Sequence, residues 1–170
     1  MKAIIMAGGE GTRLRPLTCS MPKPLAPLCA KPVSMYIIEL LIKHNISDAV
    51  FTLGYQSNKI ISYFNDEAPK GINISYSTED VPLGTAGSVK KACGEPCDVL
   101  IISGDAMCDF DLSEAIKYHQ DKNADATIIV KKVSDPREYG LVLTSDDGKV
   151  RSFLEKPSYE SCITDFANTG

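Results

Sequence analysis

The sequence lacks any run of about 20 consecutive apolar residues, the length that a membrane-spanning helix needs. Its amino terminus, MKAIIMAGG, reaches glycine too early for the apolar segment of a signal peptide. The six cysteines form no paired C-x-x-C motif and are too sparse for a secreted disulfide scaffold. Free thiols in a reducing compartment are therefore favoured over disulfides or a zinc site. Together these absences predict a cytoplasmic protein without a membrane partner.

Internal repeats, low-complexity segments and linkers are also missing, which predicts one domain over residues 1–170. Strand-like apolar runs alternate with segments of helical periodicity. The expected strands are 2–6, 49–53, 72–76, 98–103 and 126–132, and the expected helices are 34–43, 56–64, 85–93 and 112–120. Ser34 is the expected N-cap of the first helix. Such alternation is typical of an α/β fold with a mainly parallel sheet and helices on both faces.

The carboxyl-terminal part of the sequence has a different pattern of apolar residues. Two short apolar runs, 140–143 and 149–154, flank the turn-forming residues 145–148, and this arrangement predicts a hairpin.

Basic side chains are concentrated near the amino terminus. The first 32 residues contain five lysines and arginines against the single acid Glu10, a net charge of +4. Because the whole chain has a net charge of −4, the rest of it carries −8. An acidic chain with one local basic patch argues against nucleic-acid binding and for a small anion bound at one place.

Residues 8–18, GGEGTRLRPLT, combine a glycine cluster with two arginines. Glycine lets the backbone approach a ligand, and arginine offers donors suited to phosphate oxygens. A dinucleotide fingerprint would need a third glycine where Leu14 stands, and a P-loop would need lysine where Thr12 stands. The prolines that follow predict a stiff, largely extended segment that holds Lys23 at a set distance from Arg13. An ordinary proline-rich surface loop is the alternative.

The glycine segment and the Pro-Lys-Pro-Leu run at 22–25 resemble the signature of the sugar-nucleotide pyrophosphorylases, the nucleoside-diphosphate-sugar nucleotidyltransferases. Further matches follow in the same order along the whole chain: Leu-Gly-Thr-Ala-Gly at 83–87, Gly-Asp at 104–105, Tyr-Gly at 139–140, Glu-Lys-Pro at 155–157 and Asn-Thr-Gly at 168–170. The form of the 83–87 motif is most similar to the mannose-1-phosphate guanylyltransferase branch. This resemblance implies a three-layer α/β/α, Rossmann-like domain of the glycosyltransferase-A-like type.

The resemblance also implies the reaction: a sugar 1-phosphate attacks the α-phosphorus of a nucleoside triphosphate in line, and pyrophosphate leaves. Such transfer depends mainly on positioning and charge neutralisation, which suits a sequence without an evident nucleophile. By similarity, Arg13 binds the departing phosphates and Lys23 reaches the α-phosphate, with Arg15 as a supporting cation. The implied nucleotide-binding set is Gly8, Gly9, Gly11, Thr12, Arg13, Glu79, Gly84 and Thr85.

Asp105 is the expected ligand of Mg²⁺, the implied cofactor, because a hard cation prefers oxygen donors and this carboxylate follows a predicted strand. A simple Gly-Asp turn is the alternative interpretation. Asp111 immediately precedes a predicted helix and is interpreted as its N-cap, and neither it nor Asp109 is assigned to the metal.

The sugar phosphate is expected to contact a second group of residues. Glu155 would accept hydrogen bonds from sugar hydroxyls and Lys156 would bind the phosphate, although in an unrelated protein the pair would be a solvated ion pair. Gly140 would contribute its backbone N–H and Asn168 its side-chain amide.

Glu79 bears on the choice of base. Relatives that use pyrimidine nucleotides often carry glutamine at this position, which can both donate and accept, whereas ionised glutamate only accepts. Guanine presents two adjacent donors, so Glu79 favours GTP. A solvated loop charge is the alternative.

Three functions stay open from the sequence. The leading one is transfer of GMP to mannose 1-phosphate; the second is the same chemistry with glucose 1-phosphate and UTP, dTTP or ATP; the third is a non-catalytic regulatory relative. Relatives continue beyond the position of residue 170 and supply a second metal carboxylate there. A carboxyl-terminally truncated catalytic domain with poor turnover is therefore expected, and homo-oligomerisation is left open.

Overall fold

A computed structural model describes residues 1–79, 81–158 and 162–169, and in it the chain divides into two units, Met1–Leu112 and Ser113–Gly170. Gly170, the last residue of the Asn-Thr-Gly motif, lies outside the described residues.

Four parallel strands form the centre of the first unit. They are β1 (Lys2–Met6), β4 (Asp48–Leu53), β5 (Asn73–Thr78) and β6 (Val99–Ser103), in the order β5-β4-β1-β6. The two central strands are buried along nearly their whole length, as expected for strands covered on both faces. Because all four strands run in the same direction, their carboxyl ends meet at one edge of the sheet.

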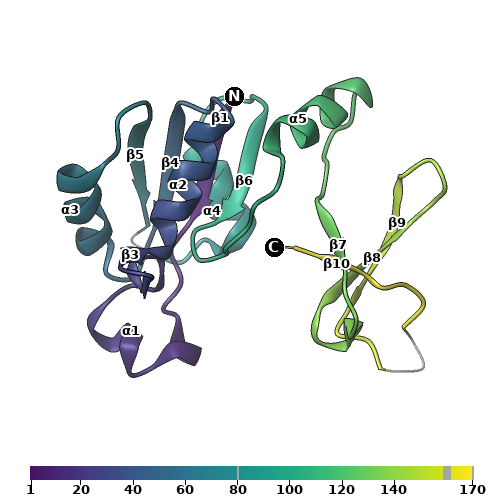
Figure 1. Ribbon diagram of the computed structural model, residues 1–170, viewed down its shortest axis with the longest axis horizontal. Coiled ribbons are helices and arrows are strands. Elements are labelled where there is room, and N and C mark those ends of the chain that lie inside the picture. Colours follow the sequence, from purple (N-terminus) through teal and green to yellow (C-terminus); the bar gives the residue numbers. More distant parts are fainter. Residues whose placement is uncertain (80, 159–161, 170) are drawn as a thin grey trace. The chain divides into compact units, whose positions relative to one another are not determined.

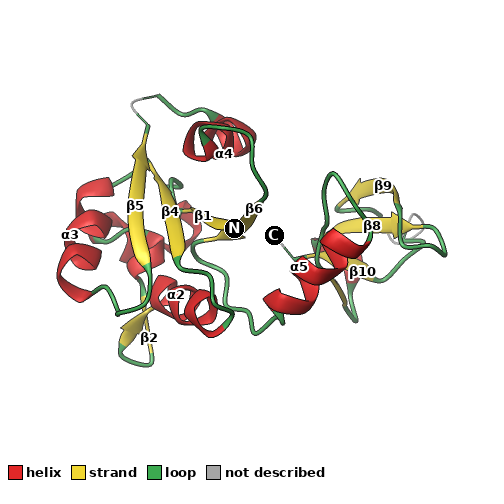
Figure 2. Ribbon diagram, turned by 90° about the horizontal axis from the view of Figure 1, so that it is seen from above, coloured by secondary structure: helices red, strands yellow, loops and turns green. Residues whose placement is uncertain are grey.

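Helices cover both faces of this sheet, which confirms the predicted α/β class. Helices α2 (Val33–Lys43) and α3 (Ser57–Glu67) lie on one face and α4 (Gly84–Cys93) on the other (Figure 2). This distribution follows from the right-handedness of parallel crossovers: β1, β4 and β5 progress in one direction, and the chain then returns past β1 to β6.

The segment between β1 and α2 differs from the extended conformation predicted for it. It contains three short helical turns, η1 (Thr12–Leu14), α1 (Leu17–Ser20) and η2 (Lys23–Leu25), followed by the two-residue strands β2 (Pro27–Leu28) and β3 (Lys31–Pro32). Pro16 stands at the N-cap of α1 and Pro24 within the first positions of η2. Proline is well tolerated at helix starts because no intrahelical bond needs its missing N–H there.

The second unit contains an antiparallel sheet. Its strands are β7 (Val130–Lys132), β8 (Gly140–Thr144), β9 (Val150–Glu155) and β10 (Phe166–Asn168), in the order β7-β10-β8-β9 (Figure 1). The predicted hairpin is confirmed as β8 and β9. The predicted continuation of the parallel alternation through 126–132 is wrong: the strand begins at Val130 and pairs antiparallel with β10. Helix α5 (Leu112–Asp121) and the turn η3 (Pro136–Glu138) complete the described elements.

In the described part of the chain, every helix is too short or too polar to cross a membrane.

Candidate active site

A cavity of about 740 Å³ lies at the carboxyl edge of the parallel sheet in the first unit. All ten residues predicted from the sequence to bind nucleotide or to act in catalysis line it: Gly8, Gly9, Gly11, Thr12, Arg13, Lys23, Glu79, Gly84, Thr85 and Asp105. These residues lie close together because they follow the carboxyl ends of β1, β5 and β6, which meet at one edge of the sheet, or belong to the segments beside those ends. This is the position at which parallel α/β sheets bind ligands.

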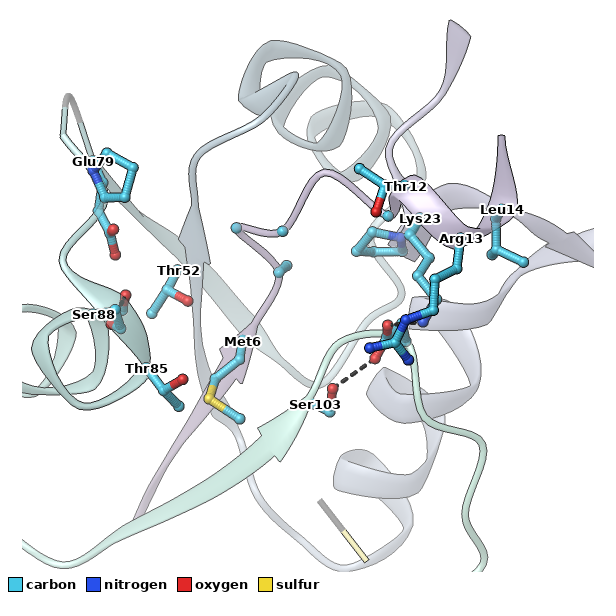
Figure 3. A pocket seen from close by; sticks show the side chains of 18 residues that line it. Met6, Thr12, Arg13, Leu14, Lys23, Thr52, Glu79, Thr85, Ser88 and Ser103 are labelled. Atoms are coloured by element: carbon cyan, nitrogen blue, oxygen red, sulfur yellow. Dashed lines mark hydrogen bonds and ion pairs between the residues drawn. The ribbon is translucent and has the colours of Figure 1, made fainter. Parts of the chain in front are cut away.

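The cavity has two sides that differ in chemistry. Figure 3 shows the cations Arg13 and Lys23 on one side, and Glu79 and Ser88 on the other. A ligand with an anionic end and a hydrogen-bonding end would match this division.

Lys23 is held by the start of helix α2. The buried Ser34 hydroxyl donates to the carbonyl oxygen of Pro24 at 2.7 Å, and the Val33 N–H donates to Ala26 O at 3.1 Å. The prediction of Ser34 as an N-cap is therefore wrong: Pro32 occupies that position, and Ser34 lies inside the helix. Its hydroxyl fixes the η2 turn that carries Lys23.

Asp105 lies directly beyond β6 and is held by two donors. The Ser103 hydroxyl donates to Oδ1 at 2.6 Å, and Lys23 Nζ forms an ion pair with Oδ2. Partial burial would raise the pKa of Asp105, but the hydrogen bonds from Lys23 and then from Ser103 outweigh burial and lower it below the usual range of aspartate. The carboxylate is thus held in its ionised form, which a divalent cation requires.

Replacing Ser103 by alanine is expected to raise the pKa of Asp105, because one of its stabilising donors is lost. A carboxyl group whose pKa is lower in the folded than in the unfolded state stabilises the protein at pH values above the unfolded-state pKa. This stabilisation disappears as the pH falls through the folded-state pKa. S103A should therefore be less stable than the wild type above that pH, and its free energy of unfolding should decrease less on acidification. NMR titration of the Asp105 carboxyl carbon measures the shift.

Ser145 provides a matched control. Its hydroxyl donates to Asp147 Oδ1 at the same 2.6 Å and the same two-residue spacing, and this bond is the main cause of the lowered Asp147 pKa. S145A should raise the pKa of Asp147 and leave that of Asp105 unchanged. An unchanged Asp105 pKa in S103A would contradict the assignment.

Arg15 does not join the cavity lining. Its guanidinium donates to Glu10 at 3.2 Å, and both side chains are exposed. Of the two arginines in the glycine segment, Arg13 is the one that the structure directs to the cavity.

Glu79 continues β5 toward the cavity: its N–H donates to Leu53 O at 2.9 Å. Its Oε2 accepts a hydrogen bond from the Leu83 N–H at 3.1 Å, and the side chain points into the cavity (Figure 3). The carboxylate is therefore oriented by its own loop.

The four residues predicted to bind sugar phosphate come together at one end of the second unit's sheet. Gly140 pairs with Glu155, and the backbone N–H of Lys156 donates to Tyr139 O at 3.1 Å. Ala167 pairs with Leu141 in the antiparallel register, which brings the next residue, Asn168, to the same end as Gly140. A Cβ on Gly140 would stand 3.0 Å from Glu155 Oε2, so the glycine leaves room for that carboxylate.

Sequence reasoning missed several polar residues of the cavity, notably Ser103, Thr52 and Ser88. Ser103 could have been found, because it immediately precedes Gly104-Asp105 at a predicted strand end. Thr52 lies inside a buried strand, and nothing in its sequence neighbourhood indicates a ligand.

Asp105 offers a carboxylate, the type of oxygen donor that Mg²⁺ prefers, and in this structure one of its oxygens is paired with Lys23. Among the described residues, no three His, Cys, Asp or Glu side chains gather into a ready metal cluster.

Comparison with known proteins gives a consistent result. Residues 2–170 match the sequence family described as nucleotidyl transferase. The chain is 40% identical to a UTP–glucose-1-phosphate uridylyltransferase of Synechocystis, covering 100% of this chain and 48% of that protein. It is 37% identical to the mannose-1-phosphate guanylyltransferase catalytic subunit beta of Xenopus tropicalis, covering 92% and 45% respectively. The chain thus spans about half the length of these curated relatives.

Solved structures resemble it as well. The crystal structure of HddC from Yersinia pseudotuberculosis superimposes with a TM-score of 0.85 at 30% identity, covering 99% of this chain and 74% of that one. The same protein complexed with GMP-PN gives a TM-score of 0.84 at 28% identity, covering 99% and 73%.

Proposed function

The chain belongs to the nucleotidyl transferase family, and on this premise we propose that it transfers a nucleotidyl group from a nucleoside triphosphate to a sugar 1-phosphate, releasing pyrophosphate. The observation that carries the proposal is the convergence of all ten predicted nucleotide and catalytic residues on one cavity.

The cationic side of the cavity would bind the triphosphate. Lys23, fixed through Ser34, and Arg13 offer charge-assisted donors that strengthen as charge moves to the leaving pyrophosphate. Gly9 supports this assignment: a side chain there would meet nothing within 4 Å, so packing does not require glycine. The space over Gly9 is instead useful for a phosphate that approaches the backbone N–H groups.

Asp105 would hold Mg²⁺, which neutralises phosphate charge when bound. The residues of the chain would otherwise act by position: they align the sugar phosphate oxygen, the α-phosphorus and the leaving group.

Glu79 supports GTP as the nucleotide. Its carboxylate is held toward the cavity and can only accept hydrogen bonds, which matches the adjacent N1–H and amine donors of guanine. Uracil and thymine present a donor flanked by acceptors, which a carboxylate would repel.

Replacing Glu79 by glutamine is therefore expected to reduce the preference for GTP over UTP by about tenfold or more, since a charged hydrogen bond contributes about 1.5–3 kcal/mol. Competition binding with the two nucleotides measures the ratio. E67Q, at the exposed end of α3, is the control and should leave the ratio unchanged. A GTP preference that survives E79Q would exclude Glu79 as the base-reading residue.

The second unit would bind the sugar phosphate through Lys156, Glu155, Gly140 and Asn168. Mannose 1-phosphate is the favoured substrate because the Leu-Gly-Thr-Ala-Gly motif at 83–87 is most similar to that branch. Glucose 1-phosphate is the competing substrate.

Pyrophosphate release with Mg²⁺ tests the whole proposal. GTP, UTP, dTTP, ATP and CTP are each offered with mannose 1-phosphate and with glucose 1-phosphate. Release restricted to GTP with mannose 1-phosphate would support both the reaction and the base assignment. Nucleotide binding without release, both for these 170 residues and for a chain extended to the length of the relatives, would favour a regulatory role.

A further inference from the structure

Two hydrogen bonds hold the glycine loop, residues 8–11, from Tyr55 and Thr18, and a third joins these two residues to each other. The Tyr55 N–H donates to Gly8 O at 3.3 Å, and the Tyr55 hydroxyl donates to Thr18 O at 3.2 Å. The Thr18 hydroxyl donates in turn to Gly11 O at 2.8 Å. Tyr55 and Thr18 do not line the cavity, yet together they connect the two ends of the loop that does.

Thr18 is fixed by its surroundings. Its side chain is buried, and its Cγ2 atom would lie 3.0 Å from a Cβ placed on Gly11. Gly11 has a φ of 62°, a conformation that favours glycine, so the contact and the backbone geometry belong together. The hydroxyl of Thr18 therefore has little freedom to leave the Gly11 carbonyl.

The helix that carries Thr18 is anchored to the segment that follows β4. Gln56 Nε2 donates to Cys19 O at 3.2 Å, and Lys59 Nζ donates to Ser20 O at 2.5 Å. These side chains satisfy carbonyls at the end of α1, where intrahelical partners are missing. Tyr55 thus connects the glycine loop to the segment after β4, and Gln56 and Lys59 connect α1 to that segment and to α3.

Glycine-rich loops lose more backbone freedom on ordering than other segments, and binding must supply that free energy unless the loop is already ordered. We infer that Thr18 and Tyr55 are positioning residues that hold the glycine loop in its phosphate-binding conformation before nucleotide arrives. This inference rests on the proposed function, in which the loop binds the triphosphate.

The experiment compares T18V, which keeps the shape but loses the hydroxyl, with T18S, which keeps the hydroxyl. Without ligand, T18V should increase amide hydrogen exchange at Leu14 and Arg15, whose N–H groups donate to Gly11 O and Thr12 O, by about tenfold. T18S should leave their exchange near the wild-type rate. Y55F should resemble T18V. Y36F removes a hydroxyl-to-carbonyl bond of 2.9 Å outside the cavity lining and should change nothing in the loop.

Nucleotide affinity gives the second readout. T18V should weaken GTP binding by about five- to tenfold and leave guanosine binding unchanged, because guanosine lacks the phosphates that the loop contacts. A general loss of structure would weaken both ligands and would overturn the inference, as would equal exchange rates in T18V and T18S. If the wild-type chain binds no nucleoside triphosphate, the proposed function fails, and the exchange comparison still decides whether Thr18 and Tyr55 order the loop.

Discussion

Replacing Lys23 by methionine is expected to slow pyrophosphate release by about 10²–10³-fold, the loss typical of removing one donor to a developing negative charge. Methionine keeps an unbranched chain of similar length, so the variant removes the ammonium group with little change in packing. Lys23 lies on the cationic side of the cavity in a turn that Ser34 holds in place. A continuous assay of pyrophosphate, with saturating nucleotide and sugar phosphate, measures the change.

K23M also has a consequence that does not depend on turnover. Asp105 loses the partner of its ion pair, so its pKa should rise. K117M is the control, because Lys117 lies on α5 and pairs only loosely with Asp121 at 3.9 Å. A K23M protein with wild-type turnover would remove Lys23 from the mechanism, whereas a raised Asp105 pKa alone would show only that the ion pair exists in solution.

Replacing Gly104 by alanine is expected to lower the free energy of unfolding by about 1–3 kcal/mol, the usual cost of overpacking a close contact. The added Cβ would stand 2.8 Å from the backbone oxygen of Met6 and 3.1 Å from Ala7 Cβ. Gly104 also donates its N–H to that Met6 oxygen at 2.7 Å, so relief of the contact would disturb the end of β1. Urea unfolding followed by circular dichroism measures the loss.

Gly9 supplies the matched control for G104A. A Cβ at Gly9 would meet no atom within 4 Å, so G9A should leave the stability unchanged while it weakens nucleotide binding. Equal stability of the two variants would show that the tight passage of β6 past β1 is not maintained in solution.

The parallel sheet could be predicted from the sequence because its strands are continuous apolar runs separated by periodic helices. The same logic located the cavity, since loops at the carboxyl ends of parallel strands must converge. The strand at Val130–Lys132 was assigned to the wrong sheet because its partner, Phe166–Asn168, lies more than thirty residues later and is only three residues long. Such a short, distant pairing leaves no periodic signal.

The conformation of the segment between β1 and α2 was predicted wrongly for a different reason. Its prolines predict a stiff, largely extended segment, but Pro16 and Pro24 stand where helical turns begin. Local sequence cannot distinguish these two uses of proline, because the choice depends on bonds to distant groups such as the Ser34 hydroxyl. The role of Ser34 was missed for the same reason.

The division of the chain at Leu112 has an evolutionary consequence. Every residue proposed to contact the nucleotide precedes it, and every residue proposed to contact the sugar phosphate follows it. Mutations that alter one selectivity therefore fall in a different stretch of the gene from those that alter the other. Recombination near codon 112 would join existing halves and create new base–sugar combinations in a single event.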